Sequence, residues 1–422
     1  MEKYSSSKID LKQSILERID LSRKVEDEEI RDIIDEAIME AGHKTYLSLP
    51  QKEKLRKELF YSIRKLDILQ ELIDNPKVTE IMINGTDCIF VEQAGKILRL
   101  EQQFKTKEKL EDVIQQIVAG CNRTVNESSP IVDARLKNGS RVNVVLAPVA
   151  LNGPIVTIRR FPEKPITMDQ LLSFESITRE AVKFLKELVI AGYNIFISGG
   201  TGSGKTTFLN ALSHYIPKDE RIITIEDSAE LQIQGIPNLV RLETRNANVE
   251  GCKEITIRDL IKASLRMRPD RIIVGEVRGP EAIDMIQCLN TGHDGSLSTG
   301  HANSAKDMLS RLETMILMGI ELPLPAIRRQ IAAGIDIIVH LGRLRDKSRK
   351  VLEITEITSY ENGEIITIPI FEFVESSETT DSKVVGQLVK TGELQHLEKF
   401  RAAGITLAGE KNGNAKEAST EL

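Results

Sequence analysis

The chain has 422 residues, with 57 Lys and Arg against 63 Asp and Glu, so its formal net charge at pH 7 is −6. Charged residues make up 28% and apolar residues 41%, which is ordinary usage for a globular protein of two or three domains. The acidic balance argues against a protein that binds nucleic acid through its whole surface. Four scattered cysteines without a C-x-x-C pair argue against a disulfide framework and a zinc ribbon.

The chain shows no sign of a secretion signal or a membrane span. Residues 1–20 are charged throughout and lack the apolar core of a signal peptide. The longest apolar run, Val144 to Leu151, is interrupted by Pro148 and is far too short to cross a bilayer. We therefore expect a soluble protein of a reducing compartment with no membrane span of its own.

The first 70 residues are dense in Lys, Glu and Asp and carry apolar residues at helical spacing. One such set recurs every three or four positions and consists of Leu55, Leu59, Ile63 and Leu66. Residues 1–70 are therefore predicted to form a small helical bundle with charged outer faces.

Residues 71–160 show the shorter apolar period of strands. Strands are expected at 80–85, 88–91, 97–100, 141–146 and 156–159, with a helix at 108–119. This pattern predicts a small α+β domain with a substantial sheet. Residues 161–175 open on Phe-Pro-Glu-Lys-Pro, which breaks every regular pattern, and are predicted to be a linker.

From residue 176 to 375, short apolar runs alternate with helical stretches. The runs lie at 195–197, 222–225, 272–274 and 335–339, and each is bounded by turn residues or charges, as strands buried on both faces should be. The order predicts an α/β domain with a doubly wound parallel sheet. Residues 376–422 are predicted to be a partly disordered extension, with a short helix near 394–403 and disorder in the last dozen residues.

A phosphate-binding signature follows the first of these strands. Residues 199–206 read GGTGSGKT, which satisfies G-x-x-x-x-G-K-[ST] between a predicted buried strand and a helix start. Glycines let successive backbone N–H groups surround phosphate oxygens, and the helix N-terminus adds partial positive charge. The sequence therefore predicts a P-loop nucleotide site formed by Gly199, Gly200, Thr201, Gly202, Ser203, Gly204, Lys205, Thr206 and Thr207.

Acidic residues end two of the other predicted strands. Glu276 follows the run at 272–274, and Glu226 follows the run at 222–225, with Glu230 four residues later. Parallel strands present their carboxyl ends at one edge of a sheet, where ligands bind. Hydrolysis of a bound nucleotide needs carboxylates to hold Mg²⁺ and to orient water. We therefore expect these acids to lie around the phosphates.

His301 and several arginines are further candidates. His301 follows a short apolar run, where its imidazole can either hydrogen-bond a γ-phosphate oxygen or serve as a structural histidine. Arginines can offset the charge that develops on a transferring phosphoryl group. Arg159 and Arg160, beside the linker, can approach the nucleotide by domain closure or from a neighbouring subunit, which would make hydrolysis depend on closure or assembly.

With these motifs in place, the chain resembles the type II/IV secretion ATPase superfamily. The resemblance covers about residues 70–375 and lies in VDARLKNGSRVNVVLAPVALNGPIVTIRRF, in LPLPAIRRQIAAGIDIIVH, and in the stretch 241–315, which includes RIIVGEVRG and GSLSTGHANSAKD. Within the superfamily the chain looks like the CpaF/TadA-type ATPases of tight-adherence (Flp) pili. Some type II secretion relatives carry a tetracysteine metal motif, which is absent here, so no structural zinc is expected.

The resemblance implies a RecA-like P-loop domain and a cytoplasmic homohexamer, peripheral to the inner face of the cell membrane. Such a motor hydrolyses ATP with Mg²⁺ to drive pilus assembly or protein secretion through inner-membrane platform proteins. By resemblance Glu230 is the preferred water-activating base, and Glu276 with Thr206 places Mg²⁺, partly through water, although the two glutamates can exchange roles. The other matched residues are Lys205, Glu226 and His301, the arginine pair Arg241 and Arg245, and the N-terminal-domain arginines Arg141, Arg159 and Arg160.

Two other functions stay open at this point. A DNA-transfer motor would need a basic channel, which the acidic balance does not favour, so no nucleic-acid partner is expected. A nucleotide-gated scaffold would bind ATP to assemble but scarcely hydrolyse it. Intact Lys205, Glu230 and Glu276 favour the motor over the scaffold.

Overall fold

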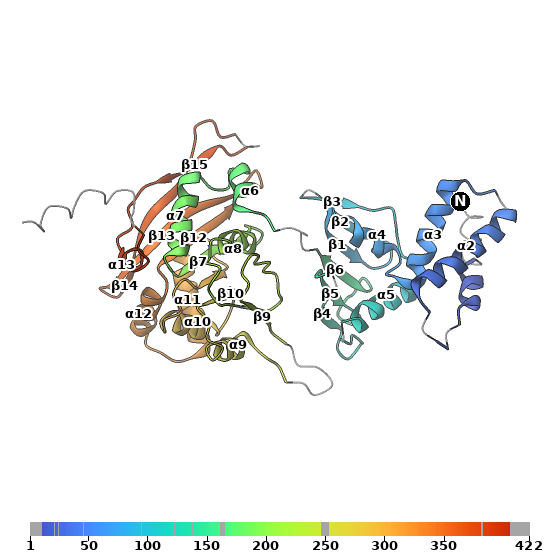
Figure 1. The fold of residues 1–422 in the computed structure, drawn as a ribbon, viewed down its shortest axis with the longest axis horizontal. Coiled ribbons are helices and arrows are strands. Elements are labelled where there is room, and N and C mark those ends of the chain that lie inside the picture. The colour runs from blue at the N-terminus through green and yellow to red at the C-terminus, as the bar shows by residue number, and fades with distance from the viewer. Residues whose placement is uncertain are drawn as a thin grey trace, which may run out of the picture. The chain divides into compact units, whose positions relative to one another are not determined.

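The computed structural model describes residues 11–405 apart from 21, 24, 45, 94, 122, 137, 161–164, 246–252 and 381–382. The chain divides into two compact units, Met1–Glu163 and Lys164–Leu422 (Figure 1). Residues 161–164 of the predicted linker and the last dozen residues lie outside the described part. Helix α6 (Met168–Ser173), which begins after the capping residue Thr167, occupies much of the remaining linker.

The first unit begins with the predicted helical bundle. Residues 11–18 are helical, and α2 (Asp27–Lys44) and α3 (Leu49–Arg64) follow. Their apolar faces meet in one core, because the buried residues of each helix recur at helical spacing. That core contains Ile15, Ile30, Ile34, Ile38, Leu55 and Leu59.

The second part of this unit is an antiparallel sheet. Among the described residues it has six strands in the order β3-β2-β1-β6-β5-β4. The apolar side chains of its strands share one core with α4 (Ile68–Asp74) and α5 (Lys107–Ala119). Strand β4 was not expected from the sequence. The strands are β1 (Val78–Asn84), β2 (Ile89–Gln93), β3 (Lys96–Arg99), β4 (Ile131–Arg135), β5 (Arg141–Val145) and β6 (Ile155–Arg159).

The second unit is built on a sheet that is parallel in one part and antiparallel in the other. Its order within the described residues is β15-β14-β13-β12-β7-β11-β10-β8-β9, in which β12 to β9 run parallel. The parallel strands are β7 (Ile195–Gly199), β8 (Ile222–Glu226), β9 (Leu239–Glu243), β10 (Arg271–Val277), β11 (Leu297–Gly300) and β12 (Ile337–Arg343). This parallel core confirms the predicted α/β P-loop fold.

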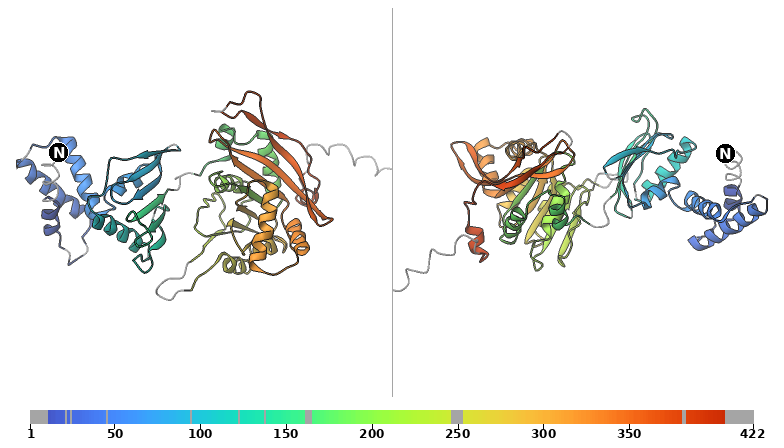
Figure 2. Two further views of the ribbon diagram at one scale, coloured as in Figure 1. Left: turned by 180° about the vertical axis from the view of Figure 1, so that it is seen from behind. Right: turned by 90° about the horizontal axis from the view of Figure 1, so that it is seen from above.

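Three antiparallel strands extend the sheet beyond β12 and form its orange and red edge in Figure 2. They are β13 (Arg349–Glu361), β14 (Glu364–Glu375) and β15 (Gly386–Lys390). None of them was expected, and β15 lies inside the segment 376–422 that was predicted to be a partly disordered extension. The short helix expected near 394–403 corresponds to α13 (Glu398–Ala402).

Helices cover both faces of this sheet (Figures 1 and 2). Because successive side chains of a strand point to opposite faces, Ile195 and Ile197 pack with α7 (Arg179–Ile190) and α8 (Lys205–Ser213), whereas Phe196 packs on the other face. The helices on that second face are α9 (Ile257–Ser264), α10 (Ala282–Leu289), α11 (Ala305–Gly319) and α12 (Leu324–Gly334).

No helix within the described ranges combines the length and the apolar character that a bilayer span requires.

Candidate nucleotide site

The P-loop connects β7 to α8 and has a backbone that requires its glycines. Gly202 and Gly204 have φ angles of 71° and 96°, a left-handed region that other residues rarely adopt. A Cβ at Gly199 would lie 2.4 Å from the carbonyl oxygen of Leu341 in β12. The loop is therefore a tight turn packed against the neighbouring strand, as a phosphate cradle requires.

Lys205 stands at the start of α8 and is only 7% exposed. Its Nζ donates to the carbonyl oxygens of Gly199 and Gly200, each at 3.2 Å, and lies 3.2 Å from Nδ1 of His301. Burial lowers the pKa of the Lys205 amine, while the nearby carboxylate of Glu276 opposes this shift. The amine is thus held at the loop by neutral acceptors, which phosphate oxygens can replace.

The carboxylate of Glu276 lies between a histidine and an arginine. Nε2 of His301 is 2.7 Å from one carboxylate oxygen, and Arg278 donates to the other at 2.6 Å. Burial, followed by Lys205, lowers the pKa of His301 and favours a neutral imidazole. In the tautomer protonated at Nε2, Nδ1 of this imidazole accepts from Lys205, while Nε2 lies beside the Glu276 carboxylate, so the ring lies between the P-loop and β10.

Thr206 and Glu230 form a second polar contact beside the P-loop. The Thr206 hydroxyl donates to a carboxylate oxygen of Glu230 at 3.4 Å. Hydroxyl and carboxylate oxygens are the ligands that Mg²⁺ prefers. The residues present therefore fit a nucleotide-bound Mg²⁺, with Thr206 as one ligand and Glu230 and Glu276 as the available carboxylates.

Glu226 is buried at the end of β8, with 3% of its surface exposed. One carboxylate oxygen accepts from the backbone N–H groups of Glu230 at 2.6 Å and Leu231 at 2.8 Å. Burial raises the pKa of Glu226 to about 7. Gly275 makes room for this side chain, because a Cβ there would lie 2.8 Å from Cγ of Glu226. These contacts orient the turn that carries Glu230.

The arginine pair predicted to assist catalysis makes backbone contacts. Arg241 of β9 donates to the carbonyl oxygen of Leu231 at 2.7 Å, and Arg245 donates to that of Lys253 at 3.1 Å. Arg241 therefore supports the turn of Glu230 from a second side, and its charge partly offsets the raised pKa of Glu226.

The remaining candidate arginines belong to the first unit. Arg141 and Arg159 lie directly opposite each other in the β5–β6 pair, on the face of the sheet that points away from its core. Arg160 donates to the backbone carbonyls of Asn75 and Val78. The structure thus brings Arg141 and Arg159 together and ties Arg160 to its own unit.

Two residues that the sequence analysis missed contact the P-loop segment. Nε of Arg349 donates to the carbonyl oxygen of Gly202 at 2.8 Å. Nδ1 of His340 lies 2.9 Å from the hydroxyl of Ser198, which directly precedes the loop. Neither belongs to a sequence motif. The available signal was the predicted strand at 335–339, whose continuation beside β7 places His340 next to Ser198.

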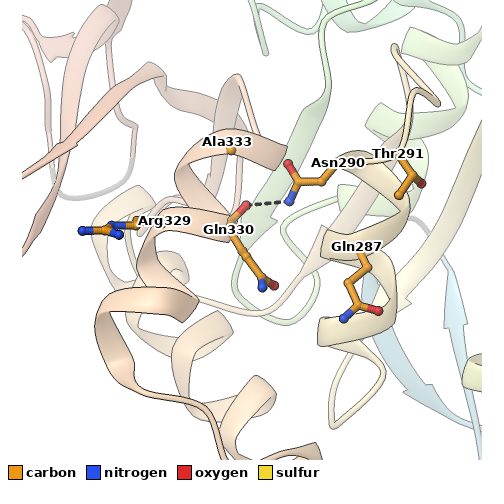
Figure 3. Close-up of a pocket in the computed structure, with 6 residues that line it drawn as sticks. All are labelled: Gln287, Asn290, Thr291, Arg329, Gln330 and Ala333. Atoms are coloured by element: carbon orange, nitrogen blue, oxygen red, sulfur yellow. Dashed lines mark hydrogen bonds between the residues drawn. The ribbon is translucent and has the colours of Figure 1, made fainter.

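A surface hollow of about 410 Å³ lies between α10 and α12, apart from the P-loop. Its lining consists of Gln287, Asn290, Thr291, Arg329, Gln330 and Ala333 (Figure 3). Within it, the side-chain amide of Asn290 donates to the backbone carbonyl of Gln330 at 3.0 Å. This lining offers amides and one exposed arginine but no cluster of acids or nucleophiles, so the chemistry of the second unit gathers at the P-loop.

Several known proteins resemble this chain in sequence. A family model described as "Type II/IV secretion system protein" matches residues 63–396. The putative conjugal transfer protein Rv3659c of Mycobacterium tuberculosis is 34% identical over 302 residues, which is 70% of this chain and 85% of that protein. The type IV secretion system protein VirB11 of Brucella suis is 31% identical over 310 residues, 65% of this chain and 84% of that protein.

The crystal structure of the Brucella suis VirB11 ATPase in complex with sulphate aligns with 68% of this chain and 94% of its own, at 30% identity and a TM-score of 0.38. The family match extends through both units and includes the P-loop and the acids and histidine around it. The chain therefore belongs to the type II/IV secretion system protein family.

Proposed function

We propose that this protein is an ATPase that hydrolyses ATP to ADP and phosphate to power a secretion or pilus machine. The observation that carries the proposal is the contact of the P-loop residues Lys205 and Thr206 with His301 and Glu230, and of His301 with Glu276. Loop, cation and carboxylates are the groups that phosphoryl transfer to water requires. Nucleotide binding alone would require only the loop.

In this proposal Glu230 orients and deprotonates the attacking water, and Glu276 holds Mg²⁺ together with Thr206, partly through water. The metal ion would neutralise charge on the phosphate oxygens. Lys205 exchanges its carbonyl partners for phosphate oxygens, and His301, which links Lys205 to Glu276, moves with the occupancy of the γ-phosphate. Comparison of Glu230→Gln with Glu276→Gln tests the assignment, because only loss of the metal-holding group should raise the Mg²⁺ concentration needed for half-maximal rate.

We further propose that the chain works as a homohexamer on the cytoplasmic face of a membrane, bound to platform proteins of the machine. Arg141, Arg159 and Arg160 of the first unit would then supply positive charge to nucleotide, and Arg241 and Arg245 would support the acidic turn. The paired and outward-facing Arg141 and Arg159 support this role, whereas the backbone contacts of Arg160 favour a structural one.

The motif resemblance favours a machine of the tight-adherence pilus type. Because the relative Rv3659c is named as a putative conjugal transfer protein, a DNA-transfer motor is the second candidate. The formal charge of −6 gives that candidate no support. Addition of single- and double-stranded DNA to the ATPase assay separates them: a stimulated rate favours DNA transfer, and an unchanged rate favours transport of protein subunits.

The central test is steady-state phosphate release across a protein-concentration series, with the mass of the assembly determined in the same samples. Lys205→Ala and Glu276→Gln serve as comparison variants. The motor proposal expects activity per chain to rise as a six-subunit species forms, and both variants to lose it. If the chain binds ATP but releases phosphate no faster than either variant at every concentration, it is either a nucleotide-gated scaffold or a motor that is silent until its membrane partner is supplied.

A further inference from the structure

The turn between β12 and β13 is held firmly by its own hydrogen bonds and by a second segment. Leu344 donates its backbone N–H to the carbonyl of Ser348 at 2.8 Å. The carboxylate of Asp346 accepts from the backbone N–H groups of Ser348 at 2.9 Å and Val384 at 2.8 Å. The side chain of Ser348, followed by the backbone N–H of Val384, lowers the pKa of Asp346 to about 2, so the carboxylate stays ionised. The turn is therefore a fixed support.

The first residues of β13 tie this hairpin to the turn between α6 and α7. Lys350 is only 5% exposed, and its Nζ donates to the carbonyl oxygen of Glu175 at 2.8 Å. The next residue, Val351, donates its backbone N–H to the carbonyl of Ser176 at 2.8 Å. The residue just before them, Arg349, is thus carried by backbone that is anchored on both sides.

From this base Arg349 contacts the outer side of the P-loop. Its Nε donates to the carbonyl oxygen of Gly202 at 2.8 Å, and its Cδ would lie 3.6 Å from a Cβ at Gly204. The N–H of the same peptide unit, on Ser203, donates to the carbonyl of Gly200 at 3.3 Å. The peptide between Gly202 and Ser203 is therefore held at both its oxygen and its nitrogen.

The orientation of this peptide matters for anion binding. In a trans peptide the C=O and N–H groups point in opposite directions, so a carbonyl directed at Arg349 leaves the Ser203 N–H on the other side of the peptide. There it donates to the carbonyl of Gly200, an acceptor that a phosphate oxygen can replace. A flipped peptide would present an oxygen to the phosphates and repel them. Because glycine adopts positive and negative φ angles about equally readily, Gly202 cannot prevent that flip by itself. The charged donor of Arg349 favours the orientation that binds anions.

Resting on the proposed ATPase function, we propose that Arg349 is a positioning residue for nucleotide binding, which holds the Gly202–Ser203 peptide of the P-loop in its anion-binding orientation. Removal of the Arg349 donor lowers the fraction of molecules whose loop is ready to bind. The apparent affinity for nucleotide falls in proportion to that fraction, because only molecules with a competent loop bind nucleotide.

The test compares full-length variants by ADP calorimetry, by the kcat and KM of ATP hydrolysis, and by thermal unfolding without nucleotide. Arg349→Met keeps the apolar stem beside Gly204 but removes the donor, and Arg349→Lys restores a charged donor. Arg345→Met is the matched control, because it removes an equal charge from the same hairpin at the ion pair with Glu375. Lys205→Met tests the proposed function itself.

For Arg349→Met we expect ADP binding about 3- to 10-fold weaker and KM for ATP raised by a similar factor, as loss of one charge-assisted hydrogen bond implies, with kcat and unfolding temperature near wild type. Arg349→Lys should regain most of the affinity, and Arg345→Met should match wild type. The inference is overturned if Arg349→Met binds ADP like wild type, or if Arg345→Met is weakened equally. If wild type fails to bind ADP, or Lys205→Met binds it equally well, the proposed function itself has failed.

Discussion

The two ends of the parallel strands in the second unit both bury charged side chains, but they hold them differently. At the carboxyl end, one oxygen of Glu226 and the hydroxyl of Ser203 are buried without a hydrogen-bond partner within the described residues. At the amino end, both carboxylate oxygens of Glu356, 1% exposed, accept backbone N–H groups, from Gln395 at 2.7 Å and His396 at 2.9 Å. Unused hydrogen-bonding capacity thus lies at the end that carries the P-loop.

The amino end is closed by the C-terminal segment of the described chain. Nζ of Lys399 lies 2.7 Å from the carboxylate of Asp336 and 2.8 Å from that of Asp294. The ring of Phe400 packs on that of Tyr193 with centroids 5.1 Å apart. Polar groups here are matched to fixed partners, which suits a stabilising contact. The polar groups under the C-terminal segment thus have fixed partners, whereas Glu226 and Ser203 beside the P-loop each keep a buried oxygen without a partner among the described residues, which suits a site that binds a ligand.

The largest expected effect is on activity, from Lys205→Met. Loss of the cation should reduce ATP turnover by about 100-fold or more, since interactions with charge in the transition state are worth about 3 kcal/mol or more. Stability should stay the same or rise, because the variant no longer buries an amine whose pKa burial lowers. Phosphate release and thermal unfolding on the same sample check both statements. A large loss of stability would show that Lys205 is a structural residue.

At the amino end, Phe400→Ala should have the opposite result, a loss of stability without a loss of activity. Phe400 is 1% exposed in the core of the second unit, so truncation should cost about 3 kcal/mol of unfolding free energy. Turnover per folded molecule at low temperature should remain near wild type, because the ring lies away from the P-loop. Denaturant unfolding and phosphate release measure the two quantities. Loss of activity without loss of stability would contradict the division between the two ends.

The sequence predicted β7, β8, β10 and β12 of the parallel part, because each of them contains a short apolar run buried on both faces. The partly exposed β9 and the four-residue β11 were not among the predicted runs. All five residues of β7 and of β8 are buried. In β13 and β14, buried and partly exposed residues mix along 13 and 12 residues. A strand with one solvated face carries charges throughout, so its apolar signal is weaker. This is why the antiparallel edge was missed.

For the site, local signals sufficed where a motif ends a strand and failed where a contact joins distant segments. Glu276 was expected near the P-loop because it follows an apolar run, and the run before His301 made that residue a candidate for a phosphate contact as well as for a structural role. Arg349 and Gly202 are 147 residues apart, and His340 and Ser198 are 142 apart. Such contacts depend on which strands pair, and spacing along the chain carries no information about that pairing. The sequence also did not predict that the Glu226 side chain is buried against the turn that carries Glu230, because this depends on the direction of the backbone after β8.

A third, smaller effect concerns the dependence of stability on pH at the carboxyl end. Burial raises the pKa of Glu226 from 4.5 to about 7, so between these values the folded protein keeps a proton that the unfolded chain has lost. Stability should therefore fall as pH rises from about 4.5 to 7, by about 2 to 3 kcal/mol from this group. Glu226→Gln should flatten that part of the profile in denaturant titrations. An unchanged profile would mean that Glu226 is ionised in the folded protein.

The smallest expected effect is on stability, and it compares a partly buried ion pair at the amino end with an exposed ion pair elsewhere. Lys399→Met removes the partner of Asp336, whose pKa burial raises and Lys399 lowers, and should cost about 1 kcal/mol at pH 8. The cost should shrink as pH falls, because a protonated Asp336 no longer needs the cation. Lys390→Met is the control, since Lys390, the last residue of the edge strand β15, pairs with the exposed Glu393. Both variants are followed by denaturant unfolding at several pH values. An equal cost for the two, with the same pH dependence, would show that the amino end gains nothing from its matched charges and that the contrast between the two ends lies in the P-loop alone.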